Sequence, residues 1–155
     1  MVRTLRARSE RGVAAVEFAL IMLPLLYLVF GVIQYGLYFY GMQAGTSTVG
    51  EAVRRLTVGN CQDSTQLKQF LADRLGAASS DPPASLAPLV TYKTGTSPPT
   101  DTAAPGVVGG SVTLKLTFQT IDLNFPFIPV PNDGKVTREV FGRVEDTTSL
   151  TNGCV

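Results

Sequence analysis

A long apolar segment dominates the pattern of hydrophobic and polar positions in the first third of the chain. No charged residue occurs between Phe18 and Gly50, and residues 18–40 are apolar apart from one glutamine, one proline and two glycines. A helix needs about 20 such residues to cross the hydrocarbon core of a bilayer. The segment is therefore predicted to be a transmembrane helix.

The helical pattern continues beyond this apolar segment. Apolar residues recur at helical spacing as far as Leu56, and Gly59-Asn60 then provides a stop signal. We predict one continuous helix over residues 13–58, which would be roughly 70 Å long at 1.5 Å per residue. Because this is about twice the thickness of the hydrocarbon core, the helix must project beyond the bilayer.

The next segment contains the signals of a second, short helix. Asp63 is a suitable N-cap, an apolar stripe runs from Leu67 to Leu75, and Gly76 follows as a stop. Residues 77–110 then contain six prolines among small and polar residues, which predicts a Pro-rich loop. Within this loop only Leu86–Lys93 is predicted to form a strand.

Two further strands are predicted near the C-terminus. Ser111–Thr120 alternates strictly between apolar and polar residues, as expected of a strand with one buried face. Lys135–Glu145 is predicted to pair antiparallel to it, with a bulge at Gly142 because Phe141 lies on the face opposite to the apolar residues and Arg138 lies on their own face. The turn signal Asn132-Asp133-Gly134 precedes this last strand.

The segment between these two strands, Ile121–Pro131, is predicted to be an irregular loop because three prolines interrupt it. Its apolar side chains Phe125, Phe127 and Ile128 need cover, either from the membrane surface or from a neighbouring molecule. The predicted fold class is α+β, with a small domain over residues 59–155 containing one short helix and an antiparallel sheet of about three strands.

The distribution of charge gives this arrangement an orientation. Four arginines and one glutamate lie within residues 1–12, directly before the apolar segment. Positive flanks stay on the cytoplasmic side, so residues 59–155 are predicted to be exported to the periplasm. The apolar segment is too long for a cleavable secretory signal. The basic cluster also lacks the interleaved aromatic residues and the basic domain of a nucleic-acid-binding protein, so no nucleic acid is expected as a partner.

Two cysteines flank the predicted exported domain. Cys61 follows the long helix and Cys154 is the penultimate residue. In an oxidising compartment a disulfide between them would tie the chain end to the end of the helix. The alternative is a pair of free, unrelated thiols.

Enzymatic chemistry has little support in the composition. The chain has no histidine, which is the commonest general base and metal ligand. The two cysteines are too far apart for a CxxC redox motif or a zinc site, and no nucleophile elbow or Gly-rich phosphate loop is present. We therefore predict no catalytic residue, no cofactor and no metal site.

Glu17 is the unusual feature of the apolar segment, because a carboxylate within a bilayer is disfavoured by roughly 2.5–3.5 kcal/mol. It lies five residues after Gly12 and directly before Phe18. The sequence from Gly12 to Phe18, with the basic residues before it, resembles the signal of type IV prepilins. That resemblance implies that a prepilin peptidase cuts between Gly12 and Val13 and removes the leader 1–12.

The same resemblance implies a role for the carboxylate in assembly. Cleavage would create an ammonium group at Val13, and Glu17, with Phe18 beside it, would contact the ammonium group of an adjacent subunit. A desolvated ion pair of this kind is satisfied only at one axial offset of the helices. The alternative is a carboxylate near the cytoplasmic headgroups that extends toward Arg11.

More narrowly, residues 11–56 resemble the TadE-like minor pilins, or pseudopilins, of tight-adherence pilus systems. The resemblance rests on the signal, on Leu23-Pro24-Leu25-Leu26, on Gly31 and Gly36, and on Glu51-Ala52-Val53-Arg54-Arg55. It implies a non-enzymatic structural protein of the bacterial inner membrane that acts in pilus assembly for attachment or secretion. The implied partners are the prepilin peptidase, other pilin subunits and the membrane-embedded assembly platform, and the extracellular pilus is a further implied location. The alternative is a signal-anchored subunit of a secretion complex that is neither cleaved nor polymerised.

Overall fold

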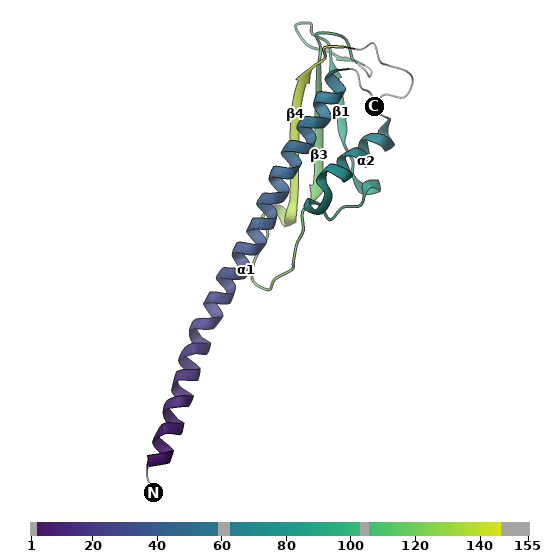
Figure 1. Cartoon of the computed structure of the whole chain (residues 1–155). Coiled ribbons are helices and arrows are strands. Elements are labelled where there is room, and N and C mark those ends of the chain that lie inside the picture. Colours follow the sequence, from purple (N-terminus) through teal and green to yellow (C-terminus); the bar gives the residue numbers. More distant parts are fainter. Residues whose placement is uncertain (1–2, 59–62, 103–105, 147–155) are drawn as a thin grey trace.

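The molecule consists of one long helix that carries a small domain on its C-terminal half (Figure 1). This computed structural model describes residues 3–58, 63–102 and 106–146, with side chains from Gly12 onward. Helix α1 spans Arg3–Thr57 as one continuous element, and Pro24 lies inside it. The predicted end near residue 58 is confirmed, whereas the helix begins at Arg3 rather than at Val13. The basic head is therefore helical and continuous with the apolar segment.

The domain contains a four-stranded antiparallel sheet in the order β2-β1-β3-β4. Its strands are β1 (Leu89–Lys93), β2 (Asp101–Thr102), β3 (Ser111–Gln119) and β4 (Lys135–Arg143). The α+β fold class is confirmed. The two-residue strand β2 is the additional one, and it is too short to leave a periodic signal in the sequence.

Helix α2 (Ser64–Leu75) forms where its capping signals predict it. The Asp63 carboxylate accepts a hydrogen bond of 2.7 Å from the backbone N–H of Gln66, which satisfies one of the free donors of the first turn. The buried stripe is Leu67, Leu71 and Leu75. Short 3₁₀ helices complete the fold, namely η1 (Gly76–Ala78), η2 (Pro83–Ser85) and η3 (Pro131–Gly134), the last at the predicted turn.

The core lies between α1, α2 and one face of the sheet. Alternate residues of β3, from Val112 to Phe118, are buried against the helices, as the strict alternation of the sequence predicts. From α1, the buried apolar residues Val49, Ala52, Val53 and Leu56 face them. The C-terminal half of α1 is thus a core helix of the domain, while its N-terminal half has no such cover (Figure 1).

The predicted bulge at Gly142 is wrong. Strands β3 and β4 pair in regular register along their whole length, with Gly142 opposite Val112. A Cβ atom at Gly142 would lie 2.6 Å from Cγ2 of Thr57 and 2.7 Å from Cγ1 of Val53. The glycine is therefore explained by the close approach of α1 to the sheet, and Phe141 simply points to the opposite, exposed face.

Two glycines of α1 serve the same close approach. A Cβ atom at Gly45 would lie 2.6 Å from Cε1 of Phe118, and one at Gly41 would clash with Cγ2 of Thr120. A pair of small residues four apart commonly allows two helices to approach closely. In this protein, the pair Gly41 and Gly45 allows α1 to approach the sheet of the same chain.

Alanine at Gly45 and at Gly50 is expected to change stability in opposite directions. Gly45→Ala should lower the free energy of unfolding by about 1–3 kcal/mol, because the Phe118 ring is fully packed and cannot move aside. Gly50→Ala should raise it by up to about 1 kcal/mol through helix propensity, since nothing lies within 4 Å of the added Cβ atom. Urea unfolding in detergent, followed by tyrosine fluorescence, measures both. Equal stabilisation by the two substitutions would contradict this packing of α1 on β3.

Candidate assembly and membrane interface

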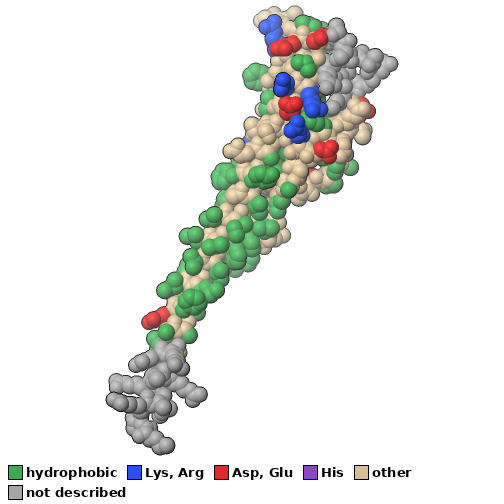
Figure 2. All heavy atoms as spheres, in the orientation of Figure 1, with side chains coloured by type: hydrophobic (Ala, Val, Ile, Leu, Met, Phe, Trp, Pro, Cys, Tyr) green, Lys and Arg blue, Asp and Glu red, His purple; other side chains and the backbone are tan. Residues whose placement is uncertain are grey.

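The N-terminal half of α1 exposes a continuous apolar surface. Within the described residues, α1 from Gly12 onward is long and apolar enough to cross a membrane, and its most apolar window has no buried residue. Figure 2 shows hydrophobic side chains around this part of the helix and most charged side chains over the domain. An exposed apolar helix of this length indicates membrane anchoring.

Glu17 is the only charged residue between Gly12 and Gly50. Its side chain is exposed, and within the described part of the chain it forms no ion pair or hydrogen bond. The neighbouring Phe18 ring is 67% exposed. The side chain of Arg11, the alternative partner of Glu17, lies outside the described residues.

Gly12 and Val13, the predicted scissile pair, lie in the regular helix of α1. A Cβ atom at Gly12 would meet nothing within 4 Å. Glycine in a helix interior is less favourable than alanine by about 1 kcal/mol. Packing within the chain therefore gives no reason for glycine at this position, in contrast to Gly41 and Gly45.

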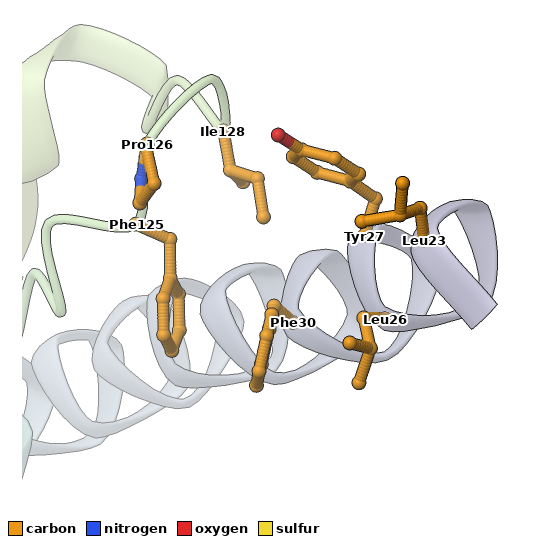
Figure 3. Close-up of a pocket in the computed structure, with 7 residues that line it drawn as sticks. All are labelled: Leu23, Leu26, Tyr27, Phe30, Phe125, Pro126 and Ile128. Atoms are coloured by element: carbon orange, nitrogen blue, oxygen red, sulfur yellow. The ribbon is translucent and has the colours of Figure 1, made fainter. Parts of the chain in front are cut away.

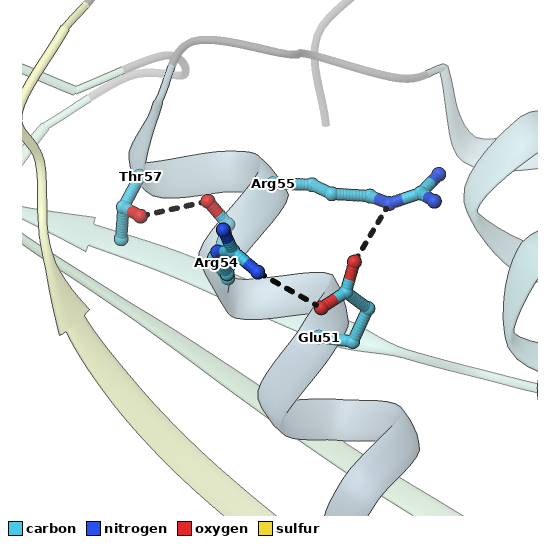
Figure 4. A network of polar contacts seen from close by, with 4 residues as sticks. All are labelled: Glu51, Arg54, Arg55 and Thr57. Atoms are coloured by element: carbon cyan, nitrogen blue, oxygen red, sulfur yellow. Dashed lines mark hydrogen bonds and ion pairs between the residues drawn. The ribbon is translucent and has the colours of Figure 1, made fainter.

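At the opposite end of α1, the Glu51 carboxylate joins two arginines (Figure 4). It lies 3.9 Å from Nη1 of Arg54 and 3.6 Å from Nε of Arg55. The guanidinium of Arg55 also lies over the Phe70 ring of α2, 4.0 Å from its centroid. This cluster fastens α2 to α1 and is structural, since each charge has a partner. The i,i+3 and i,i+4 spacings of the charges are visible in the sequence, but the contact with Phe70 is not.

A loop over residues 121–130, called the descending loop below, leaves the sheet and runs along α1 toward the N-terminus (Figure 1). Gln34 attaches it: its amide donates a hydrogen bond of 3.2 Å to the carbonyl oxygen of Ile121 and accepts one of 3.0 Å from the N–H of Leu123. Gln34 is only 1% exposed as a result. Sequence reasoning missed this role, although one glutamine inside an apolar segment is a signal for a hydrogen-bonded contact.

Aromatic contacts hold the tip of the descending loop on the apolar half of α1. The rings of Phe30 and Phe125 stack with centroids 4.7 Å apart, and those of Tyr27 and Phe127 meet edge to face at 6.4 Å. Between loop and helix lies an open apolar groove, shown in Figure 3 and lined by Leu23, Leu26, Tyr27, Phe30, Phe125, Pro126 and Ile128. The irregular conformation predicted for this segment is confirmed, and α1 gives it part of the cover that it needs.

Cys61 and Cys154 both lie outside the described residues. Two described segments near them in sequence do meet, because the backbone N–H groups of Glu145 and Asp146 donate hydrogen bonds of 2.8 Å and 3.2 Å to the carbonyl oxygen of Thr57. The chain after β4 therefore returns to the C-terminal end of α1.

Among the described residues, no group of three or more His, Cys, Asp or Glu side chains is placed to hold a metal ion.

Comparison with known proteins supports the predicted resemblance over part of α1. No curated protein and no solved structure matches the chain. The family model described as TadE-like protein matches residues 12–54. The predicted resemblance is thus confirmed, and this segment of α1, which carries Glu17 and Glu51, is similar to TadE-like proteins.

Proposed function

We propose that this protein is a structural minor pilin or pseudopilin of a tight-adherence pilus. The TadE-like match associates it with such a system. In this proposal it is held in the bacterial inner membrane with its N-terminus in the cytoplasm and residues 59–155 in the periplasm. A prepilin peptidase removes residues 1–12, and the assembly platform and other pilin subunits are its further partners. Its function in assembly is to insert α1 into the filament or prime it, and no enzymatic step is involved.

The observation that carries this proposal is the exposed, unpaired Glu17 carboxylate on an otherwise apolar helix surface. Within the described residues nothing satisfies its charge. A carboxylate in a bilayer is usually paired, so the partner is expected from another molecule. The ammonium group made by cleavage before Val13 has the opposite charge and the same apolar surroundings.

Gly12 is compatible with the proposed processing. Packing among the described residues does not require glycine there, as it does not at Gly31, Gly36 and Gly50, so the support comes from its position five residues before Glu17. A peptidase must reach the backbone at its scissile bond. Glycine leaves that bond uncovered and makes local unwinding of the helix easier.

The mature N-terminus tests the processing step. Protein purified from membranes of cells with an active prepilin peptidase should begin at Val13, and the same protein from peptidase-deficient cells should begin at Met1. Gly12→Leu should keep Met1 even when the peptidase is active. Gly31→Leu is the matched control, because Gly31 is also a helix glycine with nothing within 4 Å of an added Cβ atom. An intact N-terminus in peptidase-active cells would refute processing and favour a signal-anchored subunit that does not polymerise.

A further inference from the structure

At the tip of the descending loop, one residue has an exposed aromatic ring and an unfavourable backbone conformation. Phe127 has φ of +65° and its side chain is 88% exposed. Bulky residues rarely adopt this left-handed conformation, which is strained and persists only where the surrounding structure enforces it. The exposed ring contributes little to the packing of the domain, so we expect it to contact a partner outside the chain.

The depth of this ring in a bilayer follows from the length of the membrane span of α1. The basic head cannot enter the hydrocarbon core, so a membrane span of α1 begins no earlier than Gly12. Because about 20 residues are needed to cross the core, the span ends no earlier than Gly31. Tyr27, which contacts Phe127, then lies at least about 6 Å inside the far boundary. If the helix is tilted, more residues lie within the hydrocarbon core, so Tyr27 lies further inside its far boundary.

The composition of the loop suits this level. Asp122 is its only charged residue, at the end nearer to the sheet. Pro126 and Pro129 have no N–H group to desolvate. The N–H groups of Leu123, Asn124 and Ile128 donate hydrogen bonds to Gln34, to Asp122 and to the carbonyl oxygen of Phe125, respectively. Most other backbone groups of the loop have no such bond among the described residues, so they must stay at the level of the hydrated headgroups while the apolar side chains reach the acyl chains.

We infer that the descending loop is a membrane-inserting element. Its tip enters the boundary between the headgroups and acyl chains of the periplasmic leaflet, Phe127 contacts lipid, and an acyl chain fills the groove between Tyr27 and Ile128. A depth of about 5–10 Å is typical of segments that lie in this boundary. The inference rests on the proposed function in one respect, namely that α1 spans the membrane. The occupant is lipid because the loop and the exposed apolar surface of α1 lie at the same level.

Tryptophan fluorescence tests the inference directly, because the chain has no tryptophan. Three variants of the full chain, each with one substitution, are reconstituted into liposomes. The lipids are brominated at a shallow position of the acyl chains, and brominated lipids quench only tryptophans in contact with them. Phe127→Trp reports on the loop. Phe18→Trp, on the exposed apolar helix, reports on the span. Phe141→Trp is the matched control, because Phe141 is 80% exposed on the outer face of β4.

The expected result is strong quenching of Phe127→Trp and Phe18→Trp, with Phe141→Trp unaffected. Quenching of Phe18→Trp without quenching of Phe127→Trp would overturn the loop inference and leave the membrane span intact. Absence of quenching at Phe18→Trp would overturn both. If the emission of Phe127→Trp is blue-shifted, is not quenched by the brominated lipid and shifts further as the protein density rises, the loop contacts a neighbouring subunit. That result would also overturn insertion. Quenching of Phe141→Trp would mean that the whole domain lies on the bilayer, and it would refute membrane insertion by the loop alone.

Discussion

Glu17→Ala is expected to abolish pilus assembly while leaving cleavage after Gly12 largely intact. Within the described residues the carboxylate has no partner in its own chain, so its removal should not disturb the fold. In the filament it would leave the ammonium group of a neighbouring subunit buried without a counter-charge. Breaking a buried ion pair in this way costs about 3–5 kcal/mol, which corresponds to a loss of roughly two to four orders of magnitude in the equilibrium constant for each contact.

The measurement combines electron microscopy of surface pili with mass spectrometry of the membrane-bound protein. Glu17→Gln should have the same effect, because it keeps the size of the side chain and removes only its charge. Gln43→Ala is a suitable control, since Gln43 is also exposed on α1. Normal pili in cells with Glu17→Ala would remove the proposed assembly role. Loss of cleavage in that variant would shift the role of Glu17 to recognition by the peptidase.

We propose that Cys61 and Cys154 form a disulfide, and its loss is expected to lower the stability of the domain by a large amount. The bond would close a loop of about 90 residues, and the chain-entropy model gives such a loop about 4–5 kcal/mol of stabilisation. Both cysteines lie outside the described residues, but the hydrogen bonds from Glu145 and Asp146 to Thr57 bring the chain segments before them together. From there Cys61 is four residues away and Cys154 eight, well within the reach of an extended chain.

Cys154→Ser should accordingly lower the urea midpoint of the protein purified from an oxidising compartment. The same shift should follow from reducing the wild-type protein, whereas the variant should not respond to reductant. The oxidised wild type should also migrate faster on a non-reducing gel than on a reducing one. Equal mobility on both gels, with two alkylatable thiols, would refute the disulfide.

Elements whose signals are local could be predicted from the sequence. Helix α2 has its cap, its apolar stripe and its stop within a few residues of one another, and it forms between Ser64 and Leu75 as expected. Strand β3 alternates over nine residues because one face is buried and the other is not. The resemblance to TadE-like proteins is equally local, and the family model matches residues 12–54.

Features that depend on distant parts of the chain could not be predicted in this way. Gly142 has the same sequence signature whether it forms a bulge or makes room for a helix, and only the position of Val53 beside it decides between the two. Gln34 and Ile121 are 87 residues apart, so nothing near either residue indicates their hydrogen bond. The same holds for the descent of the loop onto Tyr27 and Phe30.

The long apolar helix, its single carboxylate and the α+β class can all be predicted from the amino-acid sequence, because hydropathy and periodicity are properties of neighbouring residues. How that helix is divided becomes visible only in the folded chain. Its C-terminal half is a core helix of the domain, with Gly41 and Gly45 against the sheet, and its N-terminal half stays exposed except where the descending loop contacts it. Packing fixes this division, since close contact depends on the shapes of two surfaces that meet only after the chain has folded.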